Sequence, residues 1–184
     1  EKKVIFKYNK GIMGRIISVI NQKGGVGKTT TAVNLAAYLA TYGQRVLLID
    51  IDPQGNASSG LGVDYKSVEQ GVYEVMLLDP VTFNDILVQT KHHNLHLAPS
   101  NMNLAGANVE LVNVDRREFR LSDNLRLIAG AYDFILIDNP PSLSLLTLNG
   151  MVAADELLIP VQCEYYALEG ISQLLNTINL EQNN

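Results

Sequence analysis

The segment Lys23–Thr30, with the sequence Lys-Gly-Gly-Val-Gly-Lys-Thr-Thr, has the residue types and spacing best suited to chemistry in this chain. Its three glycines leave backbone N–H groups free to surround an anion, because no Cβ blocks a close approach. Lys28 can place a positive charge beside terminal phosphates, and the Thr29 hydroxyl can bind Mg²⁺. The segment therefore predicts a loop that binds nucleotide phosphates.

Two features separate this segment from the ordinary G-x-x-x-x-G-K-[ST] loop. Gln22 stands where the first glycine belongs, and Lys23 is a second lysine that the ordinary loop does not require. A glycine turn in an unrelated α/β protein is the alternative interpretation. The context favours the phosphate loop, because an apolar run precedes it and a helical apolar stripe follows, which places an anion at a helix N-terminus. The extra lysine indicates a particular kind of nucleotide switch.

Alternating apolar runs and helical patterns predict a doubly wound, mostly parallel α/β sheet with helices on both faces. The predicted strands are Ile16–Ile20, Val46–Ile49, Leu95–Ala98, Phe134–Ile137 and Leu157–Val161. The clearest predicted helices are Thr29–Tyr42, Phe119–Ala129 and Ala167–Ile178. Ligands of such sheets bind at the carboxyl ends of the strands, so this edge should hold the functional residues.

Carboxylates follow two of the predicted strands at that edge. Asp138 can hold the shell of a nucleotide-bound Mg²⁺, and Asp52 can orient or deprotonate an attacking water. Asp50 lies two residues before Asp52, so both face one side of an extended strand and need a cation or solvent nearby. The stiff turn Asn139–Ser142 can sense a γ-phosphate, although a plain connecting loop and, around Asp52, a simple turn are the alternatives.

Composition describes an ordinary globular protein of 184 residues with a net charge of −5, which is not the signature of a nucleic-acid binder. Cys163 is the single cysteine, so a disulfide framework and a four-cysteine metal site within one chain are excluded. No long apolar run or secretory signal is present, and the cytoplasm is the expected compartment. We expect residues 1–12 to be an extra N-terminal segment and residues 13–184 to be one ATPase domain, incomplete at its C-terminus.

A basic cluster stands near the start of the predicted helix Phe119–Ala129. Arg116, Arg117 and Arg120 form it. A solvated surface is the simpler interpretation, and a contact with phosphate or a partner protein is the other.

The ordered motifs resemble the ParA/Soj family of partition ATPases, the deviant Walker A group of P-loop NTPases, from about Met13 to Ile178. The matching segments are Lys23–Thr30, Val46–Asn56, Pro99–Gly106, Asp138–Ser142 and Pro160–Gly170. The fold of that family is a doubly wound α/β domain. Asn139 stands where many members have Cys or Thr, and Ser144 where Gly is frequent, which bears on the rate of hydrolysis.

The resemblance implies a role for each site residue. Lys28 would hold the β- and γ-phosphates, Thr30 the α-phosphate, and Lys23 would reach across a dimer to the partner's nucleotide. Asp52 would position the hydrolytic water. The implied catalytic residues are Lys23, Lys28 and Asp52, the implied metal-binding residues are Thr29 and Asp138, and the implied nucleotide-binding residues are Lys23, Gly24, Gly25, Val26, Gly27, Lys28, Thr29, Thr30, Asp50 and Pro140.

The resemblance also implies the function: an ATPase with ATP and Mg²⁺ as cofactors, slow turnover and a homodimer when ATP is bound. A ParB-like protein would stimulate hydrolysis, and the dimer would bind DNA without sequence preference during chromosome or plasmid partitioning. The full-length protein would be cytoplasmic and associated with the nucleoid, without a membrane contact. The alternatives are a MinD-like ATPase that positions another cargo or a membrane partner, and an inactive truncated fragment.

Overall fold

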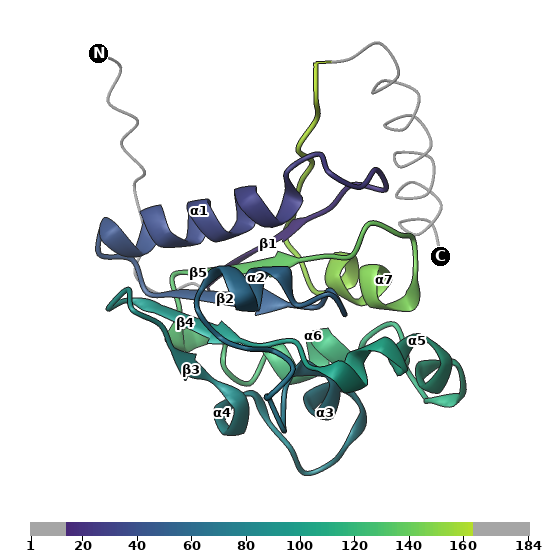
Figure 1. The fold of residues 1–184 in the computed structure, drawn as a ribbon. Coiled ribbons are helices and arrows are strands. Elements are labelled where there is room, and N and C mark those ends of the chain that lie inside the picture. The colour runs from purple at the N-terminus through teal and green to yellow at the C-terminus, as the bar shows by residue number, and fades with distance from the viewer. Residues whose placement is uncertain (1–13, 164–184) are drawn as a thin grey trace.

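Apolar runs become the strands of a single sheet in the computed structural model, which describes residues 14–163 (Figure 1). Six strands of this part pair in the order β3-β4-β2-β5-β1-β6. They are β1 (Arg15–Val19), β2 (Val46–Asp50), β3 (Val88–Gln89), β4 (Leu95–Ala98), β5 (Phe134–Asp138) and β6 (Glu156–Leu158). The strands β4, β2, β5, β1 and β6 are parallel to one another, so the predicted doubly wound, mostly parallel sheet is confirmed.

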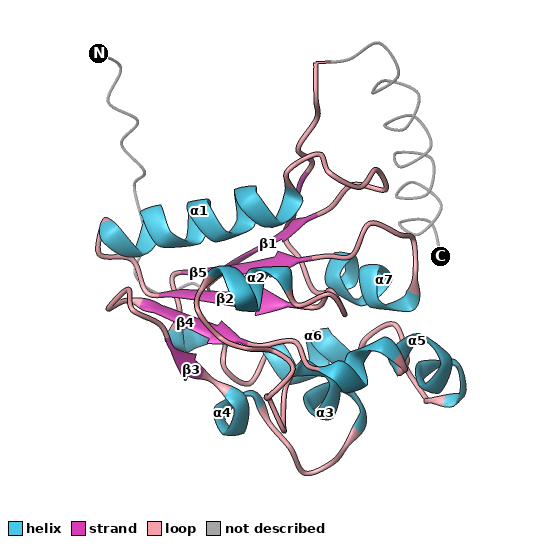
Figure 2. Ribbon diagram, in the orientation of Figure 1, coloured by secondary structure: helices cyan, strands magenta, loops and turns pink. Residues whose placement is uncertain are grey.

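The sheet differs from the prediction at one edge. β3 pairs antiparallel with β4, with Val88 opposite Leu97 and Gln89 opposite His96 (Figure 2). Two residues are too few to form an apolar run or an alternating pattern, which is why the sequence did not indicate this strand. At the other edge, β6 ends at Leu158 rather than at the predicted Val161.

Helices connect the strands, and most of them are short. They are α1 (Lys28–Thr41), α2 (Asn56–Gly60), α3 (Val72–Leu77), α4 (Phe83–Ile86), α5 (Ala107–Glu110), α6 (Arg120–Leu125) and α7 (Leu145–Val152), with 3₁₀ turns at Met102–Ala105, Leu111–Asn113 and Ala129–Ala131. No helix of the described part is long and apolar enough to cross a membrane. The predicted helix Ala167–Ile178 and the predicted extra segment 1–12 lie outside the described residues.

The predicted helix Phe119–Ala129 was wrong at its C-terminal end, because α6 stops at Leu125. The next backbone N–H groups, of Leu127 and Ile128, donate to carbonyls only three residues back. This tighter winding ends the α-helix and turns the chain toward β5. The predicted helix Thr29–Tyr42 agrees with α1 to within one residue at each end.

Both faces of the sheet are covered, which explains the continuous apolar runs of the central strands. All five residues of β2 are buried. On one face, Val46 and Leu48 pack with the small residues of α1 and with Ala57 of α2. On the other face, Leu47 and Ile49 pack with residues of α3 to α7. Figure 1 shows α1 on one side of the sheet and α3 to α6 on the opposite side.

Asn139, directly after β5, links two central strands of the sheet, β5 and β1. It is fully buried, and its Nδ2 donates to Ser18 Oγ at 2.8 Å, Val19 O at 3.1 Å and Ile137 O at 3.1 Å. Its amide therefore ties β5 to the end of β1, where the predicted phosphate loop begins. Its Oδ1 faces the backbone of Gly150 in α7, where an added Cβ would overlap it and would come within 3.0 Å of Ile51 Cδ1.

We expect the substitution Gly150→Ala to lower the free energy of unfolding by about 1–3 kcal/mol, because the Asn139 side chain has three hydrogen bonds and cannot move aside freely. Urea unfolding followed by circular dichroism measures the change. The matched control is Gly130→Ala, since an added Cβ at this exposed glycine meets no atom within 4 Å. Equal stability of the two variants would contradict this account of the packing.

Candidate functional site

The predicted phosphate loop joins the end of β1 to the start of α1. Gly27 caps α1 with a φ of 91°, a left-handed conformation that favours glycine. A Cβ added at Gly24, Gly25 or Gly27 would meet no atom within 4 Å, so all three glycines border open space. Thr29 and Thr30 lie in the first turn of α1. The loop thus presents backbone and hydroxyl groups at a helix N-terminus, which is a suitable site for phosphate.

Lys28 is the first residue of α1 and is only 7% exposed. Its Nζ donates to the carbonyl oxygen of Lys23 at 3.2 Å, so its charge is directed back along the loop. Burial lowers the pKa of Lys28, while the nearby charges of Asp138 and Asp52 raise it. The lysine therefore lies between the glycine loop and the two acids that the sequence placed at this edge of the sheet.

Asp138, the last residue of β5, is fully buried, and neither carboxylate oxygen has a hydrogen-bond partner among the described residues. Burial, together with the charge of Asp50, raises the pKa of Asp138 to about 7. The Thr29 hydroxyl is close enough to oppose this rise, but it forms no hydrogen bond of normal geometry with either oxygen. Asp138 thus offers two unsatisfied oxygen ligands beside the loop.

Asp50, opposite Asp138 in the β2–β5 register, has a different environment. Its Oδ2 accepts hydrogen bonds from Ser58 N at 2.8 Å and Ser58 Oγ at 2.7 Å, and its Oδ1 accepts from Asp52 N at 3.2 Å. Burial raises its pKa to about 6, and the bonds from Ser58 oppose this. Both Asp50 oxygens are thus used inside the protein, and its predicted contact with nucleotide stays a prediction.

Asp52 follows β2 and is 5% exposed. Its Oδ1 accepts a hydrogen bond from Gln54 N at 2.9 Å, which is the turn that the Asp-Pro-x-Gly pattern predicts. Its charge acts on Lys28 across the site. Pro140 directly follows the buried pair Asp138–Asn139 and is itself buried, whereas Pro141 and Ser142 are exposed. The predicted switch turn therefore begins inside the sheet edge and ends at the surface.

The structure adds two residues that the sequence reasoning missed as site residues. Gln162, beyond β6, donates from Nε2 to Gly25 O at 3.2 Å and lies 3.4 Å from Lys23 Nζ through its Oε1. Asn21 donates from Nδ2 to Pro160 O at 2.8 Å and accepts from Lys23 N at 3.0 Å. These bonds hold the segment after β6 against the loop. Gln162 stands within a motif of the stated resemblance, but nothing in its local pattern indicates this contact.

The site residues suit a nucleotide with Mg²⁺. Mg²⁺ is usually held by one or two carboxylates together with phosphate oxygens and water. Asp138 supplies a buried carboxylate without a partner, and Thr29 supplies a hydroxyl. No group of three or more His, Cys, Asp or Glu side chains among residues 14–163 is arranged to hold a metal by itself. The donors thus fit a cation that arrives with phosphate.

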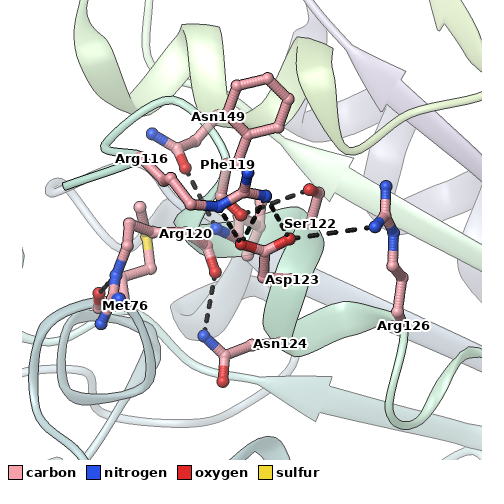
Figure 3. A network of polar contacts seen from close by, with 10 residues as sticks. Met76, Arg116, Phe119, Arg120, Ser122, Asp123, Asn124, Arg126 and Asn149 are labelled. Carbon is pink, nitrogen blue, oxygen red and sulfur yellow. Dashed lines mark hydrogen bonds and ion pairs between the residues drawn. The ribbon is translucent and has the colours of Figure 1, made fainter.

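The basic cluster near α6 is paired with local groups (Figure 3). Arg116 forms a two-pronged ion pair with Asp123, with contacts of 3.0 to 3.1 Å, and its guanidinium lies 4.9 Å from the centre of the Phe119 ring. Arg120 donates from Nε to Met76 O at 2.7 Å, and Arg117 donates from Nε to Glu118 at 2.7 Å. These contacts favour the simpler interpretation, a charged surface held together locally.

Comparison with known proteins gives consistent matches over the described residues and beyond. Residues 14–184 match the family model described as an AAA domain. The chain is 58% identical over 170 residues to the sporulation initiation inhibitor protein Soj of Bacillus subtilis, covering 92% of this chain and 67% of that protein. It is also 58% identical over 169 residues to the chromosome partitioning protein ParA of Myxococcus xanthus, covering 91% of this chain and 59% of that protein.

Among solved structures, cobyrinic acid a,c-diamide synthase from Mycobacterium smegmatis with bound ADP and magnesium superimposes with a TM-score of 0.88 and 44% identity. The superposition covers 93% of this chain and 69% of that chain. The chain thus spans about three-fifths to two-thirds of the length of the two relatives and of this neighbour.

We expect the stability of the nucleotide-free chain to fall by roughly 2–4 kcal/mol between pH 5 and pH 8. The pKa values of Asp50 and Asp138 are raised to about 6 and about 7 in the folded state, so the native protein binds more protons than the unfolded chain above pH 4. Stability is therefore lost as the pH rises through the folded pKa values. Urea unfolding in Mg²⁺-free buffer at each pH measures it.

The variant Asp138→Asn should flatten this pH dependence, because it removes the buried group with the larger shift. The control is Asp133→Asn, since the ion pair with Arg45 lowers the pKa of Asp133 and its titration lies below pH 5. A stability that rises from pH 5 to pH 8 in the unsubstituted chain would contradict the prediction.

Proposed function

The chain belongs to the ParA/Soj family of partition ATPases, and on this premise we propose that it is an ATP-dependent dimerisation switch that hydrolyses ATP slowly during chromosome or plasmid partitioning. The observation that carries the proposal is Asp138, a fully buried carboxylate without a hydrogen-bond partner in the described part of the chain, beside the glycine loop and Lys28. A buried carboxylate of this kind is stabilised by a cation.

Binding of ATP would rearrange the contacts of Lys28. Its Nζ would leave the carbonyl of Lys23 and bind the β- and γ-phosphates, where its charge is compensated more fully than by a neutral oxygen. Thr29 and Asp138 would hold the magnesium ion, Asp138 through water. The ion, when bound, would compensate the charge on the phosphate oxygens. The N–H groups of the loop would complete the phosphate site.

Lys23 would serve the nucleotide of the second subunit. It is exposed, and its Nζ lies 3.4 Å from Gln162 Oε1. Because Lys28 is bonded to the backbone of Lys23, occupation of a subunit's own site would also release the peptide that carries the partner-directed lysine. The two lysines of the loop would then respond to one ligand.

Asp52 would hold the attacking water and accept its proton, since it is a nearly buried carboxylate whose charge acts on Lys28. Slow turnover suits a switch, because the bound state is the signal. Pro140 and the turn after it would report the γ-phosphate. Asp50 would support Asp52 rather than the ligand, because both Asp50 oxygens accept hydrogen bonds from the protein.

The cargo and partners follow from the names of the relatives, Soj and a chromosome partitioning ParA. We propose a cytoplasmic, nucleoid-associated role in which the ATP-bound dimer binds DNA without sequence preference and a ParB-like protein stimulates hydrolysis. The net charge of −5 and the local pairing of the arginines near α6 argue against DNA contacts there. Such contacts would belong to parts outside residues 14–163.

Two lysine substitutions test the switch. Lys28→Ala should weaken ATP binding by about 100-fold, because a buried charge-assisted contact with phosphate is lost. Lys23→Ala should leave the ATP dissociation constant within about threefold and should abolish the ATP-dependent dimer, since its charge serves the neighbouring site. Fluorescent-nucleotide titration measures binding, and light scattering measures the dimer.

The control for both is Lys66→Ala, an exposed lysine in the loop between α2 and α3. Tight ATP binding by the Lys28 variant would contradict the proposal that this loop binds the phosphates. A normal ATP-dependent dimer of the Lys23 variant would remove the proposed contact across the dimer.

The substitution Asp52→Ala should lower ATP turnover by about 100-fold, which is the contribution of a positioned general base, and should prolong the ATP-bound dimer. Phosphate release and light scattering on the same sample measure the two effects. The control, Asp64→Ala, removes an exposed turn aspartate outside the site. Unchanged turnover of the Asp52 variant would show that another group acts on the water.

A further inference from the structure

A closed ring of hydrogen bonds surrounds the base of Asp52. Ser58 Oγ donates to Asp50 Oδ2 at 2.7 Å, and Asp50 Oδ1 accepts from Asp52 N at 3.2 Å. Ser100 Oγ donates to Asp52 O at 2.8 Å, and Ser100 N donates to Ser58 Oγ at 3.1 Å. The four hydrogen bonds link Ser58, Asp50, Asp52 and Ser100 in turn, and the last one leads back to Ser58. They join the end of β2, the middle of α2 and the loop that follows β4.

The ring is shielded from water, which raises the cost of breaking it. Asp50, Ser58 and Ser100 are fully buried, and Asp52 is 5% exposed. A buried polar group that loses its partner is destabilised by its desolvation, which water cannot repair there. The ring therefore fixes the Asp52 peptide on both sides: the N–H is held by Asp50, and the carbonyl oxygen is held by Ser100 and by Gly55 N at 2.9 Å.

Ser58 is the member on which the others depend. Its hydroxyl donates to Asp50 and accepts from Ser100 N, and its own N–H also donates to Asp50. Removing this hydroxyl would leave Ser100 N without a partner and would take one of the three hydrogen bonds from the Asp50 carboxylate. Asp50 would then be less firmly held at the place where it receives Asp52 N.

We propose that Ser58 is a positioning residue for Asp52, acting through Asp50 and Ser100. The inference rests on the proposed function, because Asp52 is placed there as the residue that holds the attacking water. Ser58 itself does not contact the ligand. Its hydroxyl sets where the Asp52 peptide lies, and therefore where the Asp52 carboxylate points. A misplacement of about 1 Å lowers the rate of a positioned reaction strongly, whereas the phosphate loop takes part in none of these hydrogen bonds and still binds the nucleotide.

The test uses the purified protein in three forms: Ser58→Ala removes the hydroxyl, Ser58→Thr keeps it, and Ser59→Ala alters the exposed neighbour on the same helix as a control. Three quantities are measured for each form: the ATP dissociation constant, the rate of phosphate release at saturating ATP, and amide hydrogen exchange of the peptide containing Asp52 to Gly55 without nucleotide. The last quantity is independent of activity.

For Ser58→Ala we expect phosphate release to fall by about tenfold with the dissociation constant within about twofold. Amide exchange of the Asp52–Gly55 segment should become about tenfold faster. Ser58→Thr should restore both values, and Ser59→Ala should match the unsubstituted protein. If the alanine variant does not fold, Ser58→Cys decides, since it keeps the shape but has a weak donor, and the same losses are expected.

Unchanged turnover and exchange in Ser58→Ala, or a folded Ser58→Thr that restores neither, would overturn the inference. The variant Asp52→Ala is measured alongside, to separate this result from a failure of the proposed function. Turnover that Asp52→Ala leaves unchanged would overturn the function proposed for Asp52 and, with it, the effect of Ser58 on turnover. The exchange measurement would then decide whether Ser58 holds the Asp52 peptide.

Discussion

Two buried carboxylates at matching positions of neighbouring strands are the constraint on which this structure depends. Asp50 on β2 and Asp138 on β5 are paired in register, and both are fully buried. Such a pair is unstable unless hydrogen bonds or positive charge compensate it. The protein treats the two acids differently: Ser58 and the Asp52 N–H donate hydrogen bonds to Asp50, whereas Asp138 has the Thr29 hydroxyl and the charge of Lys28 nearby.

The sheet order explains how these groups come together. β5 lies between β2 and β1, so Asp138 is adjacent both to the acids that follow β2 and to the loop that follows β1. The Asn139 side chain then links the end of β5 to the end of β1 through hydrogen bonds to Ser18 and Val19. α7 follows, and its residue Asn149 accepts a hydrogen bond from Leu121 N and donates one to Arg117 O, which ties the helix after the switch turn to α6 and to the segment before it.

Features that depend on local pattern could be predicted from the sequence. Buried parallel strands require continuous apolar residues, and the glycine loop requires its spacing, so both were evident. The short helices α2 to α5 were not, since fewer than two turns give no reliable period. The hydrogen bond between Ser100 and Ser58 joins residues 42 apart, and that between Asn139 and Ser18 joins residues 121 apart. The spacing of neighbouring residues in the sequence cannot indicate hydrogen bonds between residues so far apart.

The different hydrogen bonding of Asp50 and Asp138 also indicates a different role for each acid. A carboxylate whose two oxygens accept buried hydrogen bonds is already compensated inside the protein, so Asp50 needs a cation less than Asp138 does. A buried carboxylate without partners is the reverse case, because a cation relieves its desolvation. Asp138 and Lys28 thus form a site whose charges a phosphate group and its cation would compensate. In the proposed function, the binding energy of the nucleotide would be used to rearrange the loop.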